Sequence, residues 1–189
     1  MDSALIVSNS EKGTNFIIQM LNAASIQEIE VLKSCGESRR LLIEREFDLV
    51  IVNAPLRDES GESLSRYVAS KNISQVILLV NSEHFDEISA VCEEDGVLTV
   101  SKPVNRTIFW SALKLASSAQ KQVKRIQAEN NMLKQKIEDI RAIDRAKCLL
   151  ISYLSMSEQE AHRYIEKQAM DLRTTRRAIA EGIQKMYEN

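Results

Sequence analysis

The last third of the chain contains basic residues with the spacing of a phosphate-binding site. Arg173, Arg176 and Arg177 surround Thr174, where a short helix is expected to begin. Guanidinium groups beside the unpaired amides of a helix amino terminus form a good phosphate site. Without a ligand, each cation there opposes the helix dipole by about 0.3–1 kcal/mol. The pattern fits a phosphate site and a tolerated surface charge equally well.

Other side chains of this segment extend the basic surface if they share a face. They are Lys147, His162, Arg163 and Lys167. We do not expect His162 to ligate a metal. Tyr164 offers a ring on which a nucleic-acid base can stack, but its spacing with Ala161 and Ile165 favours a place in the core. The same two interpretations stay open for Tyr153.

The residue patterns of common catalytic sites are absent from the sequence. It has no phosphate-binding glycine loop, no nucleophile elbow and no metal-ligand cluster, and its three cysteines are far apart. We therefore expect a protein that is not an enzyme, needs no cofactor or metal, and works in the reducing cytoplasm. No apolar run approaches the roughly 20 residues of a membrane helix, so no membrane partner is expected.

Short apolar runs alternate with helical spacing in residues 1–117. Runs without polar alternation are typical of strands buried on both faces, and strands separated by helices form parallel sheets. This pattern predicts an α/β domain of the flavodoxin-like, doubly wound class. The expected strands are 4–7, 29–32, 49–52, 76–80 and 97–100, and the expected helices are 12–24, 36–46, 61–70 and 83–93.

A long helix is predicted next, because no Gly or Pro occurs between Asn105 and Gly182. Its apolar residues recur in steps of three and four, with Asn130 at a core position, which favours a parallel two-stranded coiled coil. The alternative is one amphipathic helix packed on its own domain, but the stripe is narrow for that. We expect residues 118–145 to form a dimeric coiled-coil linker. Its seam is Val123, Ile126, Asn130, Leu133, Ile137 and Ile140, preceded by Ala116 and Ala119.

Residues 146–189 have the pattern of a small module of three helices. The first is the end of the long helix, and two shorter helices follow it. Ser157 and Glu160 have the spacing of a capping box at the start of its second helix. That helix is expected to bury one face, and Thr174 is expected to cap the last helix. The predicted buried residues are Ala161, Tyr164, Ile165, Gln168 or Ala169, then Ile179, Ile183 and Met186.

The first domain resembles the receiver domain of two-component response regulators over residues 1–117. The resemblance rests on the strand order and on the segment SKPV, which contains Lys102 and Pro103. It implies that the site for phosphorylation has lost its acids. The acidic pair is replaced by Ser8 and Asn9, the phosphoacceptor aspartate by Asn53, and the hydroxyl residue by Val80, while Lys102 is kept.

An amide at Asn53 lacks the anionic oxygen that attacks a phosphoryl group, and carboxylates normally hold the Mg²⁺. We therefore predict a pseudo-receiver that is not phosphorylated and serves as a docking or dimerisation surface. Glu11 and Asp58 lie near the site in sequence, and we interpret both as solvated surface acids.

The carboxyl-terminal module resembles the ANTAR domain, an RNA-binding module of antitermination regulators. The matching segments are AKCLLI, SEQEAHRYI, AMDLR and AIAEGI, within about residues 141–186. The domain order is similar to that of regulators of the amidase-operon type. The resemblance implies a dimer that binds paired stem-loops in nascent transcripts and prevents a terminator from forming.

Two alternatives remain open, a receiver-like DNA-binding regulator and a dimeric protein-interaction adaptor. The absence of Gly in the turn after Arg173 argues against a helix-turn-helix. Residues 1–120 have 11 basic and 17 acidic side chains, whereas residues 121–189 have 14 basic and 10 acidic ones. We therefore expect a polyanionic partner to bind the second half of the chain. Without phosphate as a signal, we expect a regulatory protein partner on the pseudo-receiver or the coiled coil.

Overall fold

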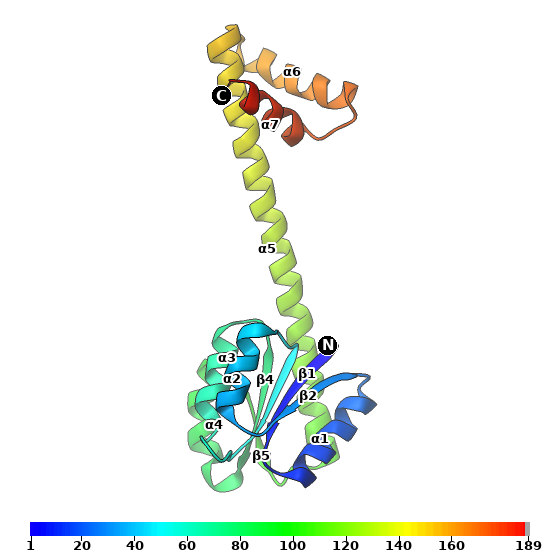
Figure 1. Ribbon diagram of the computed structural model, residues 1–189, viewed down its shortest axis with the longest axis vertical. Helices are drawn as coiled ribbons and strands as arrows, with labels where there is room; N and C mark the ends of the chain where they lie inside the picture. Colours follow the sequence, from blue (N-terminus) through cyan, green and yellow to red (C-terminus); the bar gives the residue numbers. More distant parts are fainter. Residues whose placement is uncertain (188–189) are drawn as a thin grey trace. The chain divides into compact units, whose positions relative to one another are not determined.

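The computed structural model describes residues 1–187 of the chain. It divides into two compact units, Met1–Arg125 and a second unit that begins at Ile126. The first unit is a sheet covered by helices, and the second consists of helices (Figure 1). Among the described helices, none is both long and apolar enough to cross a membrane.

The sheet of the first unit has five parallel strands in the order β2-β1-β3-β4-β5. This is the doubly wound arrangement that the sequence predicts, and each expected strand lies within one or two residues of an observed one. The strands are β1 (Ser3–Ser8), β2 (Glu28–Leu32), β3 (Leu49–Asn53), β4 (Gln75–Asn81) and β5 (Leu98–Lys102).

Helices cover both faces of the sheet, which explains the uniformly apolar strands. On β3, Leu49 and Ile51 point into one core with Ile17 and Phe109, whereas Val50 points into the other. Burying each such side chain contributes roughly 1.5–3 kcal/mol. Helices α1 (Glu11–Ala23) and the first turns of α5 (Arg106–Leu154) cover one face, and α2 (Cys35–Glu44), α3 (Glu62–Ser70) and α4 (Phe85–Glu94), preceded by the short η1 (Ser82–His84), cover the other (Figure 1).

Polar contacts fix α5 to the amino-terminal edge of the strands. The buried Gln120 side chain donates to the carbonyl of Ile73 at 2.8 Å. Lys124 lies 2.6 Å from the carboxylate of Asp48, which also accepts from the amide of Asp2 at 2.6 Å. Burial would raise the pKa of Asp48, but the hydrogen bonds from Lys124 and Asp2 outweigh it and lower that pKa.

The second unit packs the later turns of α5 against α6 (Glu158–Asp171) and α7 (Arg176–Tyr187). The capping box is confirmed, because Ser157 and Glu160 each bind the other's backbone amide. The small residues let the helices approach closely, as the full burial of Ala161 and Ala180 indicates. The buried core consists of Ala146, Leu150, Ala161, Ile165, Ala180 and Ile183.

Three predictions about this unit are wrong. Thr175, not Thr174, caps α7, since its hydroxyl accepts from the amide of Ala178 at 3.2 Å. Tyr164 is not a core residue, because 39% of it is exposed. Met186 is 74% exposed and also lies outside the core.

The cysteines differ sharply in their surroundings. Cys35 and Cys92 are buried in the first unit, and Cys148 is exposed on α5. Burial, reinforced by the carboxylates of Asp58 and Glu59, raises the pKa of Cys35 to about 11. Burial also raises the pKa of Cys92. Both buried thiols are therefore protonated at neutral pH.

Candidate functional site

The residues that the sequence predicts for a degenerate receiver site meet at the carboxyl ends of the parallel strands. Asn53 ends β3 and Ser8 ends the neighbouring β1, so the sheet brings their side chains together. The Asn53 amide donates to the Ser8 hydroxyl at 2.9 Å, and both residues are buried. Gly13 of α1 leaves the room for this amide, because a Cβ there would lie 2.6 Å from Asn53 Nδ2. A neutral hydrogen bond occupies this part of the site.

Among the remaining residues of this site, Lys102 and Asn9 form hydrogen bonds with backbone groups. Lys102 donates to the carbonyl of Ala54, and burial lowers the pKa of its ammonium group. The amide of Asn9, in its better-satisfied orientation, donates to the carbonyl of Lys33 at 3.1 Å and accepts from the amide of Arg57 at 2.9 Å. Val80 is buried in the apolar core and offers no hydroxyl.

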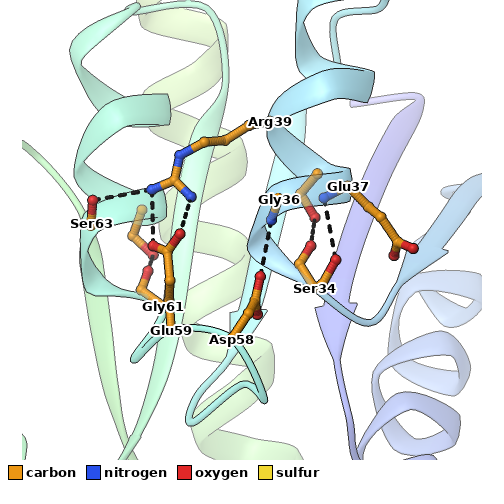
Figure 2. A network of polar contacts seen from close by, with 10 residues as sticks. Ser34, Gly36, Glu37, Arg39, Asp58, Glu59, Gly61 and Ser63 are labelled. Atoms are coloured by element: carbon orange, nitrogen blue, oxygen red, sulfur yellow. Dashed lines mark hydrogen bonds and ion pairs between the residues drawn. The ribbon is translucent and has the colours of Figure 1, made fainter.

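The loop between β3 and α3 is tied to α2 by a polar network, which Figure 2 shows. Arg39 makes two hydrogen bonds with the Glu59 carboxylate, at 2.6 and 3.0 Å, and a third with the Ser63 hydroxyl at 3.1 Å. Asp58 accepts from the amide of Gly36 at 3.0 Å, so its carboxylate caps α2 together with Ser34. Asp58 is exposed, as expected of a surface acid, and its carboxylate has this capping role in addition.

This network also explains the closest grouping of possible metal ligands in the described chain. The ligand atoms of Cys35, Asp58 and Glu59 lie within 4.8 Å of one another. However, the Glu59 carboxylate is paired with Arg39, and the Asp58 carboxylate binds backbone amides of α2. Both acids have structural partners, and we assign no metal site here.

In the helical unit, two of the predicted basic residues have acidic partners. Arg177 of α7 lies 2.8 Å from Asp139 of α5 and 2.7 Å from Glu181. These hydrogen bonds raise the pKa of Arg177 and lower that of Asp139. Arg176 lies 3.1 Å from Glu166 of α6. Both arginines therefore join α7 to neighbouring helices.

Lys147 and His162 also have acidic neighbours. Lys147 lies 2.8 Å from Asp144 and 3.4 Å from Glu158, so it bridges α5 and the start of α6. Its hydrogen bond with Asp144, more than that with Glu158, raises the pKa of its ammonium group. His162 lies 3.3 Å from Glu166. These residues do not line the same hollow as Arg163 and Lys167.

Arg163 and Lys167 lie together on one side of α6 and have no ion pair within residues 1–187. They line an open groove of about 440 Å³ with the turn between α5 and α6. Arg173, at the end of α6, likewise has no ion pair among the described residues, and its backbone is left-handed with φ 49°. The groove residues are Leu154, Ser155, Met156, Glu160, Arg163, Tyr164 and Lys167.

Tyr164 is the residue of this groove for which the sequence favoured the core over a stacking surface. Residues 160, 163, 164 and 167 recur in steps of three and four, as do the buried Ala161, Ile165 and Ala169. Tyr164 has helical spacing with both sets, so spacing alone did not decide whether its side chain faces the groove or the core. The flanking charges at Arg163 and Lys167 were the available signal.

The expected coiled-coil seam forms an exposed apolar stripe in the single chain. Within the second unit its apolar residues are half-exposed or more, from 50% for Ile126 and Ile137 to 59% for Ile140. Leu133 is 58% exposed, and Asn130 is exposed between Ile126 and Leu133. Large side chains with this exposure on one helix face are available to a partner.

Comparison with known proteins identifies the second unit. Residues 131–183 match the ANTAR domain. A curated relative, the transcriptional regulatory protein PdtaR of Mycobacterium tuberculosis, is 27% identical over 136 residues, which cover 72% of this chain and 66% of that protein. The chain therefore spans somewhat less than two thirds of the length of the curated relatives it matches.

Solved structures identify the fold of the first unit. The signal receiver domain of an HD domain-containing protein from Pseudomonas fluorescens Pf-5 has a TM-score of 0.56 and 23% identity, covering 65% of this chain and 91% of that one. A CheY-like receiver domain from Methanospirillum hungatei JF-1 has a TM-score of 0.55 and 20% identity, covering 65% and 98%. This chain therefore contains a segment, residues 131–183, that matches the ANTAR domain, and its amino-terminal domain has the receiver fold.

Proposed function

We propose that the protein is a transcription antitermination regulator that binds paired stem-loops in nascent RNA and prevents a terminator hairpin from forming. The observation that carries this proposal is the ANTAR match over residues 131–183. The name of PdtaR, a transcriptional regulatory protein, supports the regulatory role. Nascent transcripts lie in the cytoplasm, where we expect the protein to act.

We propose that phosphorylation is not the signal. The hydrogen bond between Asn53 and Ser8 supports this, because it fills part of the site with two neutral side chains. A carboxylate is needed both to accept the phosphoryl group and to hold the Mg²⁺ that neutralises it. A regulatory protein that binds the pseudo-receiver is the input that we propose instead.

We propose that the active species is a homodimer joined by a parallel coiled coil. The exposed stripe from Ile126 to Ile140 supports this, and Asn130 in its middle would fix the register of the two helices. We divide the chain accordingly into a receiver-like domain 1–117, a linker 118–145 and an RNA-binding domain 146–189. The ANTAR match begins within that linker, at residue 131.

Seven basic residues remain candidates for contact with RNA, and their surroundings rank them. Arg163, Lys167 and Arg173 rank first, since none has an acidic partner within residues 1–187. Each of the others must give up a contact with an acidic side chain to bind a phosphate, which reduces its net contribution. They are Lys147, His162, Arg176 and Arg177.

The test is selection of RNA by the purified full-length protein without any phosphodonor. The starting pool has two tandem hairpins with randomised loops, and parallel binding reactions contain duplex DNA or unstructured single strands. We expect enrichment of two-hairpin RNA, with affinity that falls steeply with salt as phosphate contacts require. Preference for duplex DNA would favour the DNA-binding alternative, and no nucleic-acid binding would favour the adaptor.

A further inference from the structure

The groove beside α6 combines a flat ring with two cations that have no acidic partner. Tyr164 is 39% exposed and lines the groove together with Arg163 and Lys167. Neither cation has an ion pair within the described residues 1–187. This differs from the basic residues at the start of α7, where Arg176 and Arg177 have acidic partners.

The one acid of the groove is committed to the helix start. The Glu160 carboxylate accepts from the amide and from the hydroxyl of Ser157, each at 2.8 Å. These bonds lower the pKa of Glu160 and direct its oxygens toward the capping box. With Arg163 and Lys167 the lining has a net positive charge, and Leu154 and Met156 provide an apolar wall.

These features fit a base and its phosphates better than a protein surface. Loop nucleotides have unstacked bases that stack on aromatic rings, and phosphates on either side that pair with Arg or Lys. The exposed Leu154 offers an apolar contact to the base edge. An apolar protein partner would leave both cations without compensation.

We propose that this groove receives one unpaired base of an RNA hairpin loop, stacked on Tyr164, while Arg163 and Lys167 bind the flanking phosphates. The inference rests on the proposed function, since it assumes that the ligand is structured RNA. It makes Tyr164 the residue that holds the loop base, and it gives Arg176 and Arg177 a mainly structural role.

The experiment uses full-length protein and the two-hairpin RNA obtained by selection, with 2-aminopurine in each loop. The variants are Y164A, Y164F and the double variant R163Q/K167Q. The controls are M170A, which shortens a more exposed side chain of α6 outside the groove, and K185Q, which removes an exposed cation of α7. Circular dichroism confirms that each variant is folded.

We expect Y164A to lower the affinity roughly 5- to 100-fold and to abolish the fluorescence quenching that stacking causes. The slope of log affinity against log salt should not change for Y164A. Y164F should behave like the wild type, since its ring remains. The double variant should lower the magnitude of that slope by about 0.7 for each lost phosphate contact.

The outcomes separate this inference from the proposed function. If the wild type enriches no RNA, the proposed function fails and the inference fails with it. If the wild type binds RNA and Y164A binds as well as M170A, the groove has another ligand, such as a protein, and only the inference is overturned. Equal losses in Y164F and Y164A would overturn the stacking geometry.

Discussion

The side-chain amide of Asn53 donates a 2.9 Å hydrogen bond to the hydroxyl of Ser8, joining the carboxyl ends of β3 and β1. We proposed above that this pair replaces the carboxylates of a phosphorylated receiver. We expect N53D alone to remain unphosphorylated when incubated with acetyl phosphate and Mg²⁺, because Ser8 and Asn9 provide no second acid for the metal. Intact-protein mass spectrometry detects the added phosphoryl group.

The matched control restores all three acids in the variant S8D/N9D/N53D. Labelling of this variant under the same conditions would show that the missing carboxylates are what limits the reaction. Labelling of N53D by itself would show that one carboxylate is enough for phosphorylation and that Ser8 and Asn9 do not prevent it.

The exposed stripe of α5 predicts which substitutions would separate the proposed dimer. L133K places a charge in the seam, and we expect it to produce monomers in sedimentation velocity experiments. M132K is the matched control, because Met132 and Leu133 are similarly exposed in the single chain, at 63% and 58%. Met132 is not one of the seam residues. Equal behaviour of the two variants would argue against a coiled coil at this face.

Asn130 provides a second test of the same helix. We expect N130V to dimerise more tightly, since an apolar residue at a core position replaces an amide that fixes register at a cost in stability. Sedimentation equilibrium over a dilution series gives the dissociation constant. Unchanged affinity would place Asn130 outside the seam.

Arg177 is expected to contribute more to the packing of α7 than Arg176 does. Exposed ion pairs contribute about 0.2–1 kcal/mol each, and Arg177 contacts Asp139 and Glu181, whereas Arg176 contacts Glu166. R177A should therefore lower the opening free energy of α7 about twice as much as R176A does, because it removes two ion pairs and R176A removes one. Hydrogen exchange of the full-length protein measures both, and a larger effect in R176A would contradict the assignment.

Acid should weaken the attachment of α5 to the sheet. Hydrogen bonds from Lys124 and Asp2 outweigh burial and hold the pKa of Asp48 below its ordinary value of 3.8. The stabilisation is complete above that ordinary value and is lost as pH falls through the lowered pKa of the folded state. K124M should cost about 0.5–1 kcal/mol at pH 7 and less in acid.

Urea unfolding at pH 7 and at pH 3 measures this difference. K121M is the control, because Lys121 is exposed on the same helix and has no acidic partner within residues 1–187. A K124M effect that is equal at both pH values would mean that Asp48 is not the titrating partner.

The end of α6 offers a stability test that leaves charge constant. Arg173 has a left-handed backbone with φ 49°, which favours glycine and costs other residues roughly 1 kcal/mol or more. R173G should therefore be more stable than R173A by about 0.5–1 kcal/mol in thermal unfolding. Both variants remove the same charge, so they should bind RNA equally.

The parallel sheet could be predicted because its signal is local and repeated. The runs around Leu49 and Val76 are apolar throughout, and only strands covered on both faces tolerate that pattern. The long helix could be predicted for the same reason, because the absence of Gly and Pro is also a local signal that continues along the segment. Each feature is decided by neighbours within a few residues.

The details of the helical unit depend on contacts that are distant in sequence or on backbone geometry. The amide of Thr174 donates to the carbonyl of Ala169 at 2.9 Å, so Thr174 closes α6 and leaves Thr175 to cap α7. Arg177 pairs with Asp139, 38 residues away along the chain. No local pattern distinguishes such a residue from Arg163, which has no acidic partner within residues 1–187.

The missing glycine after Arg173 was also a weaker argument than it looked. Arg173 itself adopts the left-handed conformation of the turn, so absence of Gly does not exclude a sharp helix–helix connection. The binding experiment that compares duplex DNA with hairpin RNA is therefore what distinguishes a DNA-binding regulator from an RNA-binding one.

The contrast among the cysteines makes the native chain suitable for labelling at one position. Maleimides and other thiol reagents attack the thiolate of an accessible cysteine. Cys35 is buried with a pKa of about 11, and Cys92 is buried with a raised pKa, whereas Cys148 is exposed on α5 of the helical unit. A fluorophore on Cys148 would report hairpin binding in single-molecule measurements without the introduction or removal of any cysteine.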